Sequence, residues 1–304
     1  MKVLFTGATG VLGRPAVPLL LSAGHEVAAV ARNDNDRKWL QGLGARPVEC
    51  DLFDPDSVDT TVAGAEAVVH FATAIPSQQQ MTKREAWAAN DRLRSDATRV
   101  LVDASLTRGV GRFVQQSITL PYADGGEDWL DEDSPTDPGW EVLDSALEAE
   151  RQLERFRRGG GTGVTLRLSR VYGPGRASGE YIAGIQARKI PVIGKGETYV
   201  SSIHVDDAAT ALAAAMTASN GVYNVSDDNP VTAAAYNDSL AEALGAPRPR
   251  RVPRFLARLI VGEALALLNT SQRVSNRRFR AATGWAPAFA SVIEGWRDVV
   301  ATRD

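Results

Sequence analysis

The fold is decided by the first 32 residues, MKVLFTGATGVLGRPAVPLLLSAGHEVAAVAR (residues 1–32). A short apolar run at residues 3–5 precedes a glycine-rich turn. Residues 11–23 then carry apolar side chains at helical spacing, and residues 27–30 form a second apolar run that predicts a strand. Strand, turn, helix and strand in this order are typical of a parallel sheet with helices packed on it.

The glycines of this turn have a spacing that suits phosphate binding. Gly7, Gly10 and Gly13 form G-x-x-G-x-x-G between the strand and the helix. The first permits a tight turn, the second lets the backbone approach a pyrophosphate, and the third lets the helix pack close to the sheet. The helix N-terminus offers free N–H groups and a positive dipole end. A glycine turn without a ligand is the alternative, and the strand–loop–helix context favours nucleotide binding.

The end of the second strand bears on the choice of cofactor. NAD binders commonly place an acid there for the ribose 2′-OH, whereas an arginine accommodates the 2′-phosphate of NADP. This strand ends at Arg32, with no acid at its tip. The sequence therefore predicts NADP held by Arg32. NAD stays open as a cofactor because Asp34 or Asp36 can reach a ribose, and a solvated surface arginine is the other interpretation of Arg32.

Charge and metal-ligand content exclude several classes of protein. With 34 Lys and Arg against 37 Asp and Glu, the net charge of -3 argues against a nucleic-acid or anionic-membrane binder. A single cysteine and three dispersed histidines give no metal-ligand spacing, so we expect no metal site. His204 is expected to be structural, and Asp206 or Asp207 to cap the alanine-rich helix that follows.

Two further features bear on location. No apolar run is long enough to span a membrane. The N-terminus becomes rich in glycine and threonine too soon for the apolar core of a signal peptide. We therefore expect a cytoplasmic protein with no membrane partner.

Strand and helix patterns alternate through the first part of the chain and give way to helices. We expect an α/β fold, a Rossmann-type doubly wound parallel sheet with a small, mostly helical C-terminal substrate domain. The dinucleotide-binding domain is expected at 1–171, with 203–226 returning to it, and the substrate domain at 172–202 and 227–304. Expected strands are 3–5, 27–30, 46–50, 67–71, 113–116, 164–168 and 222–225; expected helices are 11–23, 37–43, 55–63, 83–107, 142–157, 205–218, 232–244, 253–268, 275–282 and 289–302.

Several motifs in order resemble the extended short-chain dehydrogenase/reductase family, in its NAD(P)-dependent epimerase/dehydratase group. TGATGVLG (6–13) resembles that family's cofactor loop, and CDL (50–52) resembles the strand end that meets adenine. VVHFA (68–72) resembles the segment beside the cofactor, and VYGPG (171–175) the segment near the nicotinamide. Further matches are GVGRFV (109–114), IHVDDA (203–208), YNV (223–225) and TGWAP (283–287).

The resemblance carries expectations about ligands and assembly. It implies a nicotinamide cofactor, a small organic substrate and a homodimer that pairs the helices at 83–107 and 142–157. The cofactor-binding residues that we expect from the motif and the resemblance together are Gly7, Thr9, Gly10, Val11, Leu12, Gly13, Arg32, Asp51, Leu52, Phe71, Ala72, Thr73, Ser169 and Val171.

One part of that family's pattern is missing. Its chemistry uses a Tyr-x-x-x-Lys pair, in which the lysine lowers the tyrosine pKa and the tyrosine moves a proton while the nicotinamide moves a hydride. No Tyr-x-x-x-Lys occurs anywhere in this chain. The acidic loop at 132–138 resembles the family's loop before the tyrosine, and Ser145 and Glu150 resemble residues that follow the pair. This resemblance implies that Val142 stands at the position of the tyrosine and Ala146 at that of the lysine. We therefore expect the usual acid–base mechanism to be absent.

Three hydroxyl groups near the fifth strand remain as candidate catalytic groups. Ser117 and Thr119 can replace the family's hydroxyl, although the closest match falls on Ile118. A local hydrogen bond to the backbone explains each of them equally well. Tyr122 carries a polar tip that can face the pocket. Asp144, a water molecule and the substrate itself are the other proton sources considered.

These observations predict an atypical NADP-dependent oxidoreductase, a reductase by preference. Without the tyrosine, the expected substrates need little proton help from the protein, and a conjugated alkene or imine fits better than an alcohol. Two alternatives stay open. One is a catalytically silent NAD(P)-binding sensor or scaffold, and the other is a nucleotide-sugar epimerase or dehydratase with substitute residues.

Overall fold

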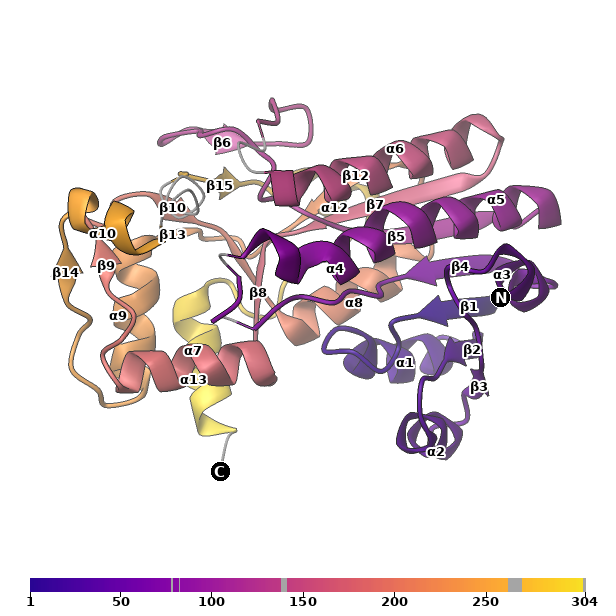
Figure 1. Cartoon of the computed structure of the whole chain (residues 1–304), viewed down its shortest axis with the longest axis horizontal. Coiled ribbons are helices and arrows are strands. Elements are labelled where there is room, and N and C mark those ends of the chain that lie inside the picture. Colours follow the sequence, from indigo (N-terminus) through magenta and orange to yellow (C-terminus); the bar gives the residue numbers. More distant parts are fainter. Residues whose placement is uncertain (78, 82, 138–140, 262–269, 303–304) are drawn as a thin grey trace.

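The computed structural model describes residues 1–77, 79–81, 83–137, 141–261 and 270–302. A seven-stranded parallel sheet lies on the right of Figure 1, and smaller C-terminal elements lie on the left. The expected Rossmann-type α/β fold is confirmed. In spatial order the strands are β12 (Gly221–Val225), β7 (Thr162–Leu168), β5 (Arg112–Ile118), β4 (Ala67–His70), β1 (Lys2–Thr6), β2 (Glu26–Val30) and β3 (Arg46–Val48).

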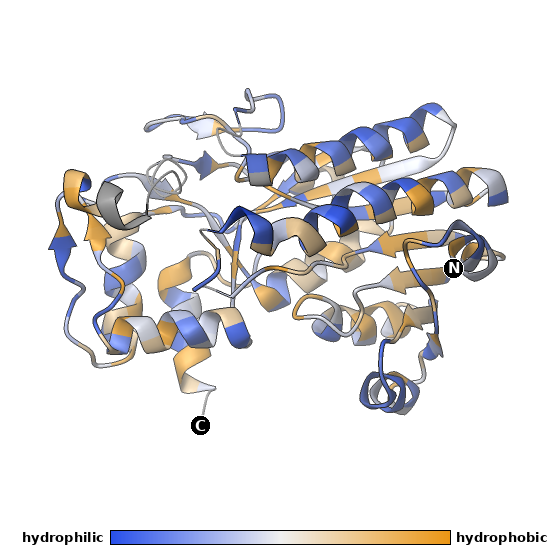
Figure 2. Ribbon diagram, viewed as in Figure 1, coloured by the Kyte–Doolittle hydropathy of each residue, from blue (hydrophilic) through white to orange (hydrophobic). Residues whose placement is uncertain are grey.

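Both faces of the sheet are buried. Val3 and Phe5 of β1 enter one apolar core and Leu4 enters the other, because side chains alternate along a strand. Strands buried on both faces read as continuous apolar runs, which explains why they were visible in the sequence (Figure 2). One face is covered by α1 (Gly13–Ser22), α2 (Asp34–Gly42), α8 (Val205–Ala215) and α12 (Arg277–Thr283), and the other by α3 (Pro55–Val62), α5 (Thr98–Arg108) and α6 (Asp144–Arg158).

The helix expected as one piece at 83–107 is divided. At a π turn, the carbonyl oxygen of Leu93 accepts hydrogen bonds from His70 Nε2 at 3.2 Å and from the Thr98 hydroxyl at 3.4 Å. The expected stop at Gly109 is confirmed, since this residue adopts a left-handed conformation with φ 68°. The pieces are a 3₁₀ turn (Arg84–Trp87), α4 (Ala88–Arg92), the π turn (Leu93–Ala97) and α5.

The capping of α8 differs from the expectation. The cap is the ring of His204, whose Nδ1 accepts from the Asp206 N–H at 3.3 Å. The expectation that Asp206 or Asp207 would cap the helix is therefore wrong. Asp207 instead accepts from the backbone N–H groups of Ala288 at 2.7 Å and Phe289 at 3.1 Å. It thereby ties a C-terminal segment to the sheet domain.

The C-terminal elements have an apolar core of their own, which includes Tyr172, Tyr236 and Trp296. The sequence did not predict α7 (Arg176–Gln186), whose Gly179 and Gly184 weaken its helical pattern. Of the helix expected at 253–268, α10 (Arg254–Val261) is present and 262–269 lie outside the described residues. The other elements are a 3₁₀ turn (Glu141–Leu143), α9 (Ala233–Ala243), α13 (Val292–Ala301), and the strand pairs β6 (Trp129–Leu130) with β15 (Arg273–Val274), β8 (Arg170–Tyr172) with β11 (Ser202–His204), β9 (Val192–Ile193) with β14 (Arg251–Val252), and β10 (Tyr199–Val200) with β13 (Val231–Thr232).

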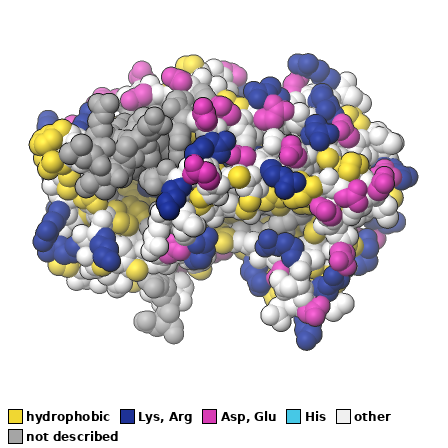
Figure 3. Space-filling view, in the orientation of Figure 1, with side chains coloured by type: hydrophobic (Ala, Val, Ile, Leu, Met, Phe, Trp, Pro, Cys, Tyr) yellow, Lys and Arg dark blue, Asp and Glu magenta, His cyan; other side chains and the backbone are white. Residues whose placement is uncertain are grey.

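Two features of the molecule as a whole follow from this arrangement. Figure 3 shows a notch between the C-terminal elements on the left and the sheet domain on the right. Within the described part of the chain, every helix is too short or too polar to cross a membrane.

Candidate functional site

The glycine loop between β1 and α1 packs tightly against the end of β4. Gly7 has φ 86°, and a Cβ atom there would lie 2.5 Å from the backbone of Phe71 and Ala72. A Cβ atom on Gly13 would lie 2.3 Å from the carbonyl oxygen of Gly7. Only glycine fits at these two positions, so the loop is held close to the sheet in one shape. Phe71 and Ala72, two of the residues expected to bind the cofactor, thus lie beside this loop.

The N-terminus of α1 is open to an anion. No side chain caps it, and its first turn contains no acidic residue. The N–H of Gly10 is bonded to the Gly7 carbonyl at 3.0 Å, which sets the turn. Val11 is half exposed, and a Cβ atom on Gly175 would lie 3.4 Å from it, so the 173–175 turn passes beside the loop. This cradle fits the pyrophosphate of a dinucleotide.

Arg32 follows β2 and is exposed. Among the residues described, no carboxylate forms an ion pair with it. Asp36, an alternative ribose ligand, is engaged: it accepts from Asn33 Nδ2 at 2.9 Å and lies 3.5 Å from the Arg14 guanidinium. Asp34 remains exposed. Arg32 is thus an exposed cation with no ion-pair partner among the described residues, and its contact with a cofactor stays a prediction.

The expected cofactor residues share one edge of the sheet, because the carboxyl ends of parallel strands lie together. The Asp51 carboxylate accepts from the Phe53 N–H at 3.0 Å, and its second oxygen has no hydrogen-bond partner among the described residues. Ser169 is buried, and its hydroxyl has no hydrogen-bond partner among the described residues. Val171 lies within β8, the strand that comes next after β7. Residues that follow strand ends are Gly7, Thr9, Gly10, Val11, Leu12 and Gly13 after β1, Arg32 after β2, Asp51 and Leu52 after β3, Phe71, Ala72 and Thr73 after β4, and Ser169 after β7.

Ser117 belongs to a buried polar network. Its hydroxyl donates to Glu150 Oε1 at 2.6 Å. Arg167 binds the same carboxylate through two bonds, Nε to Oε1 at 2.9 Å and Nη2 to Oε2 at 2.6 Å. The side chains of this ion pair are each 11% exposed. The Ser117 proton is therefore committed to Glu150 and is not free for a substrate.

Tyr122 belongs to the same network. Its hydroxyl donates to Asn224 Oδ1 and accepts from Arg167 Nη1, both at 2.8 Å. Burial raises the pKa of Tyr122, although the charge of Arg167 opposes this. The family's catalytic tyrosine needs the opposite shift, so the geometry does not support Tyr122 as a proton donor.

Thr119 is the expected catalytic residue that keeps a free hydroxyl. It is 3% exposed, and its side chain has no hydrogen-bond partner in the described parts of the chain. Its N–H donates to the Leu168 carbonyl at 3.1 Å, which places Thr119 at the carboxyl ends of β5 and β7. Thr119 thus differs from Ser117 and Tyr122, whose hydroxyls are hydrogen-bonded within the network.

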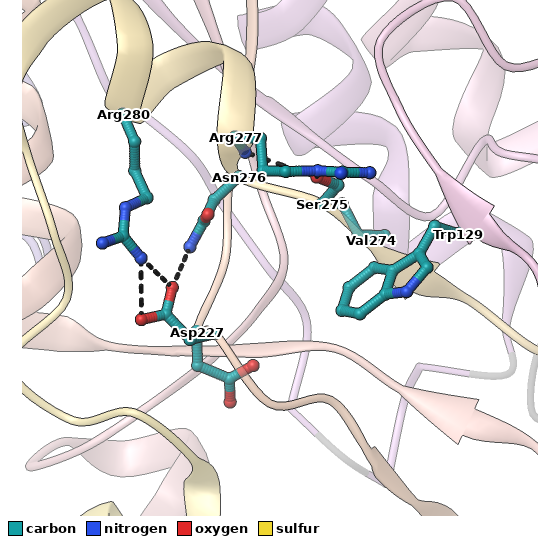
Figure 4. A pocket seen from close by; sticks show the side chains of 8 residues that line it. Trp129, Asp227, Val274, Ser275, Asn276, Arg277 and Arg280 are labelled. Carbon is teal, nitrogen blue, oxygen red and sulfur yellow. Dashed lines mark hydrogen bonds and ion pairs between the residues drawn. The ribbon is translucent and has the colours of Figure 1, made fainter.

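A polar pocket, which the sequence did not indicate, lies between residues 227–228, which follow β12, and residues 274–280, which run from β15 into α12 (Figure 4). Asp228 accepts from Arg280 and from Asn276 Nδ2 at 2.8 Å. Neighbouring Asp227 is 2% exposed, and neither of its carboxyl oxygens has a partner among the described residues. Burial raises the pKa of Asp227 well above its usual value, since loss of solvent disfavours the charged carboxylate.

The comparisons with known proteins agree with this geometry. The model of the NAD dependent epimerase/dehydratase family matches residues 3–226. The chain belongs to this family. It is 36% identical to the 3-diazoavenalumate denitrifying reductase of a Streptomyces species, over 98% of each chain. It is 26% identical to the 2-alkyl-3-oxoalkanoate reductase of Stenotrophomonas maltophilia, over 86% of this chain and 81% of that one.

The fold also matches solved structures of sugar-modifying enzymes. A dTDP-glucose 4,6-dehydratase from Streptomyces venezuelae, solved with NAD, superposes with a TM-score of 0.81 over 99% of this chain and 96% of that one. The two sequences are 19% identical, so this likeness concerns the fold alone. The resemblance found in the sequence motifs is confirmed as family membership.

The family's Tyr-x-x-x-Lys pair has no counterpart in this sequence. Ala146, the position expected to replace the lysine, is 1% exposed in α6. The side chain of Val142, the other expected position, lies outside the described residues. The assignment of these two positions stays a prediction, while the absence of the motif is a property of the sequence.

The network generates a stability prediction. Glu150→Gln keeps the shape of the side chain but leaves the buried charge of Arg167 without its partner. We expect the free energy of unfolding to fall by about 3 kcal/mol, measured by urea denaturation. Glu148→Gln on the same helix removes a surface pair with Arg151 and should cost under about 1 kcal/mol. Equal losses in the two variants would show that the network does not stabilise the fold.

Proposed function

We propose that this protein is an NADPH-dependent reductase that delivers hydride to a strongly electron-poor carbon, with a diazonium-type arene as the preferred substrate class. The observation that carries the proposal is the engagement of Ser117 and Tyr122 in the buried network. The phosphate cradle is thus intact, while two of the three candidate hydroxyls donate their protons to other side chains. The 36% identity to a reductase whose name joins a diazo substrate to denitrification supports the same chemistry.

The reaction balances without a proton from the protein. When bound, the reduced cofactor supplies a hydride. A diazonium carbon that accepts this hydride forms a C–H bond while its C–N bond breaks. The bonding pair leaves with dinitrogen, so the positive charge of the substrate and the negative charge of the hydride cancel. The substrate is reduced and the cofactor is oxidised, and no acid or base is required.

The residues of this chain then act by binding and orientation. The loop at 7–13 holds the pyrophosphate through backbone N–H groups, and Arg32 holds the 2′-phosphate. Thr119 lies at the strand ends where the family resemblance places the nicotinamide, and its hydroxyl can donate a hydrogen bond to a polar substituent on the substrate. Holding two reactants in a reactive geometry is itself a large contribution to the rate.

The alternative functions make different demands on the same site. A conjugated alkene or imine needs one proton after the hydride, which solvent can supply. A nucleotide-sugar epimerase or dehydratase must remove a proton from an alcohol, and the engaged hydroxyls argue against it. A silent sensor would bind the cofactor and transfer nothing.

Turnover tests the proposal directly. With NADPH and 2-hydroxybenzenediazonium, we expect oxidation of NADPH, phenol and dinitrogen in equal amounts, at a rate well above that without protein. Gly13→Val, which blocks the phosphate cradle, should reduce the rate to the uncatalysed level. Tight NADPH binding without oxidation by diazonium, alkene or imine substrates would contradict a reductase and favour a sensor.

The cofactor choice gives a second prediction. Arg32→Ala removes a charge-assisted contact to the 2′-phosphate, so NADPH should bind roughly 10- to 100-fold more weakly while NADH affinity stays the same. Fluorescence titration measures both constants. Arg46→Ala is the control, because Arg46 is exposed at the start of β3, away from the carboxyl edge. Equal losses for NADH and NADPH would contradict a 2′-phosphate contact.

A further inference from the structure

Arg170 is a cation with an unusual setting. It begins β8, immediately after Ser169, and it is exposed. Protein nevertheless surrounds it closely enough that burial is the largest influence on its pKa. A side chain can have both properties where protein atoms pack around it and part of its surface still meets solvent. The sequence analysis did not assign this residue a role.

Two tyrosines hold the guanidinium group. Its central carbon lies 5.2 Å from the ring centre of Tyr236 on α9 and 5.8 Å from that of Tyr181 on α7. The Tyr181 hydroxyl donates to Asn237, so its oxygen remains an acceptor. Although burial lowers the pKa of Arg170, charge interactions and hydrogen bonds with Tyr236 and Tyr181 raise it overall. The phenols therefore orient the cation without neutralising it.

Arg170 lacks the compensation that the neighbouring buried arginine has. Arg167 forms a two-bond ion pair with Glu150. No carboxylate of the described residues lies within ion-pair distance of Arg170. A guanidinium carries five N–H donors in a fixed fork, and two phenol oxygens cannot use all of them. The remaining donors are available to an anion.

The chain places this cation beside the expected reaction end of the site. Leu168 accepts from the N–H of Thr119, and Ser169, with its unpartnered hydroxyl, is the residue before Arg170. The N–H of Arg170 donates to the Ser201 carbonyl at 3.1 Å, which fixes its backbone to the start of β11. Arg170 thus projects from a rigid strand, two residues beyond the end of β7.

We propose that Arg170 binds the carboxylate of the substrate, so that the substrates of this site are organic carboxylates. The inference rests on the proposed reductase for the identity of the site and adds the class of its substrate. A single guanidinium fork held by neutral phenols matches one carboxylate through two parallel hydrogen bonds. A substrate anchored there by its carboxylate presents its opposite end toward Thr119.

Binding of a non-reactive carboxylate tests this without turnover. Calorimetry compares trans-cinnamate, cinnamamide and phenyl phosphate on the wild-type protein, with and without NADPH. The variants are Arg170→Met, which keeps the length without charge, and Arg170→Lys, which keeps charge without the fork. Arg46→Met is the control for loss of an exposed arginine. Thermal unfolding of each variant verifies that it is folded.

We expect wild-type protein to bind cinnamate at least tenfold more tightly than cinnamamide. Arg170→Met should remove this difference, Arg170→Lys should restore part of it, and Arg46→Met should leave it intact. Equal binding of acid and amide, absence of cinnamate binding, or an Arg170-dependent preference for phenyl phosphate would each overturn the carboxylate site.

The two proposals fail separately. Arg170-dependent cinnamate binding by a protein that oxidises no NADPH with diazonium, alkene or imine substrates would contradict the reductase and support the carboxylate site. Diazonium reduction with the same KM for 4-carboxy and 4-carboxamide substrates, unchanged by Arg170→Met, would support the reductase and overturn the carboxylate site.

Discussion

The two-bond ion pair between Arg167 and Glu150 is the interaction on which the proposed chemistry depends. It joins β7 to α6, and the same two side chains engage the hydroxyls of Ser117 and Tyr122. Because both charges are nearly buried, each hydrogen bond in the network is costly to break. The network therefore stabilises the contact between sheet and helix and also withholds two protons from the site. The same ion pair thus contributes to the stability of the fold and to the proposed reactivity of the site.

The glycine loop is the other part of the site on which the proposed function depends. Close contacts at Gly7 and Gly13 hold a backbone cradle at the carboxyl edge of the sheet, with an uncapped helix N-terminus behind it. This arrangement suits the phosphates of a dinucleotide, and it is independent of how protons move. The family model matches residues 3–226, which include this loop. What differs is the proton-transfer part, and a hydride acceptor that expels its own leaving group makes that part unnecessary.

The sequence predicted those features of the fold that depend on residues close together in the chain. The apolar strands, the glycine loop and the stop at Gly109 were visible because burial on both faces and a left-handed turn restrict residue choice directly. The π turn at Leu93 was not visible, since a distant histidine stabilises it. The same holds for Ser117, whose partner stands 33 residues away, and for Arg170, which two other helices surround. Contacts between segments that are distant in the sequence decide which hydroxyl stays free. The spacing of residues along the chain does not predict such contacts.

The origin of the new hydrogen in the product tests the central claim most directly. Reduction of 2-hydroxybenzenediazonium by NADPH deuterated at the transferred C4 position, in ordinary water, should give phenol with one deuterium at the carbon that held nitrogen. Reduction by ordinary NADPH in heavy water should give none at that carbon. Deuterium that enters from solvent instead would mean that a proton donor acts at the carbon, and would contradict hydride transfer without proton help.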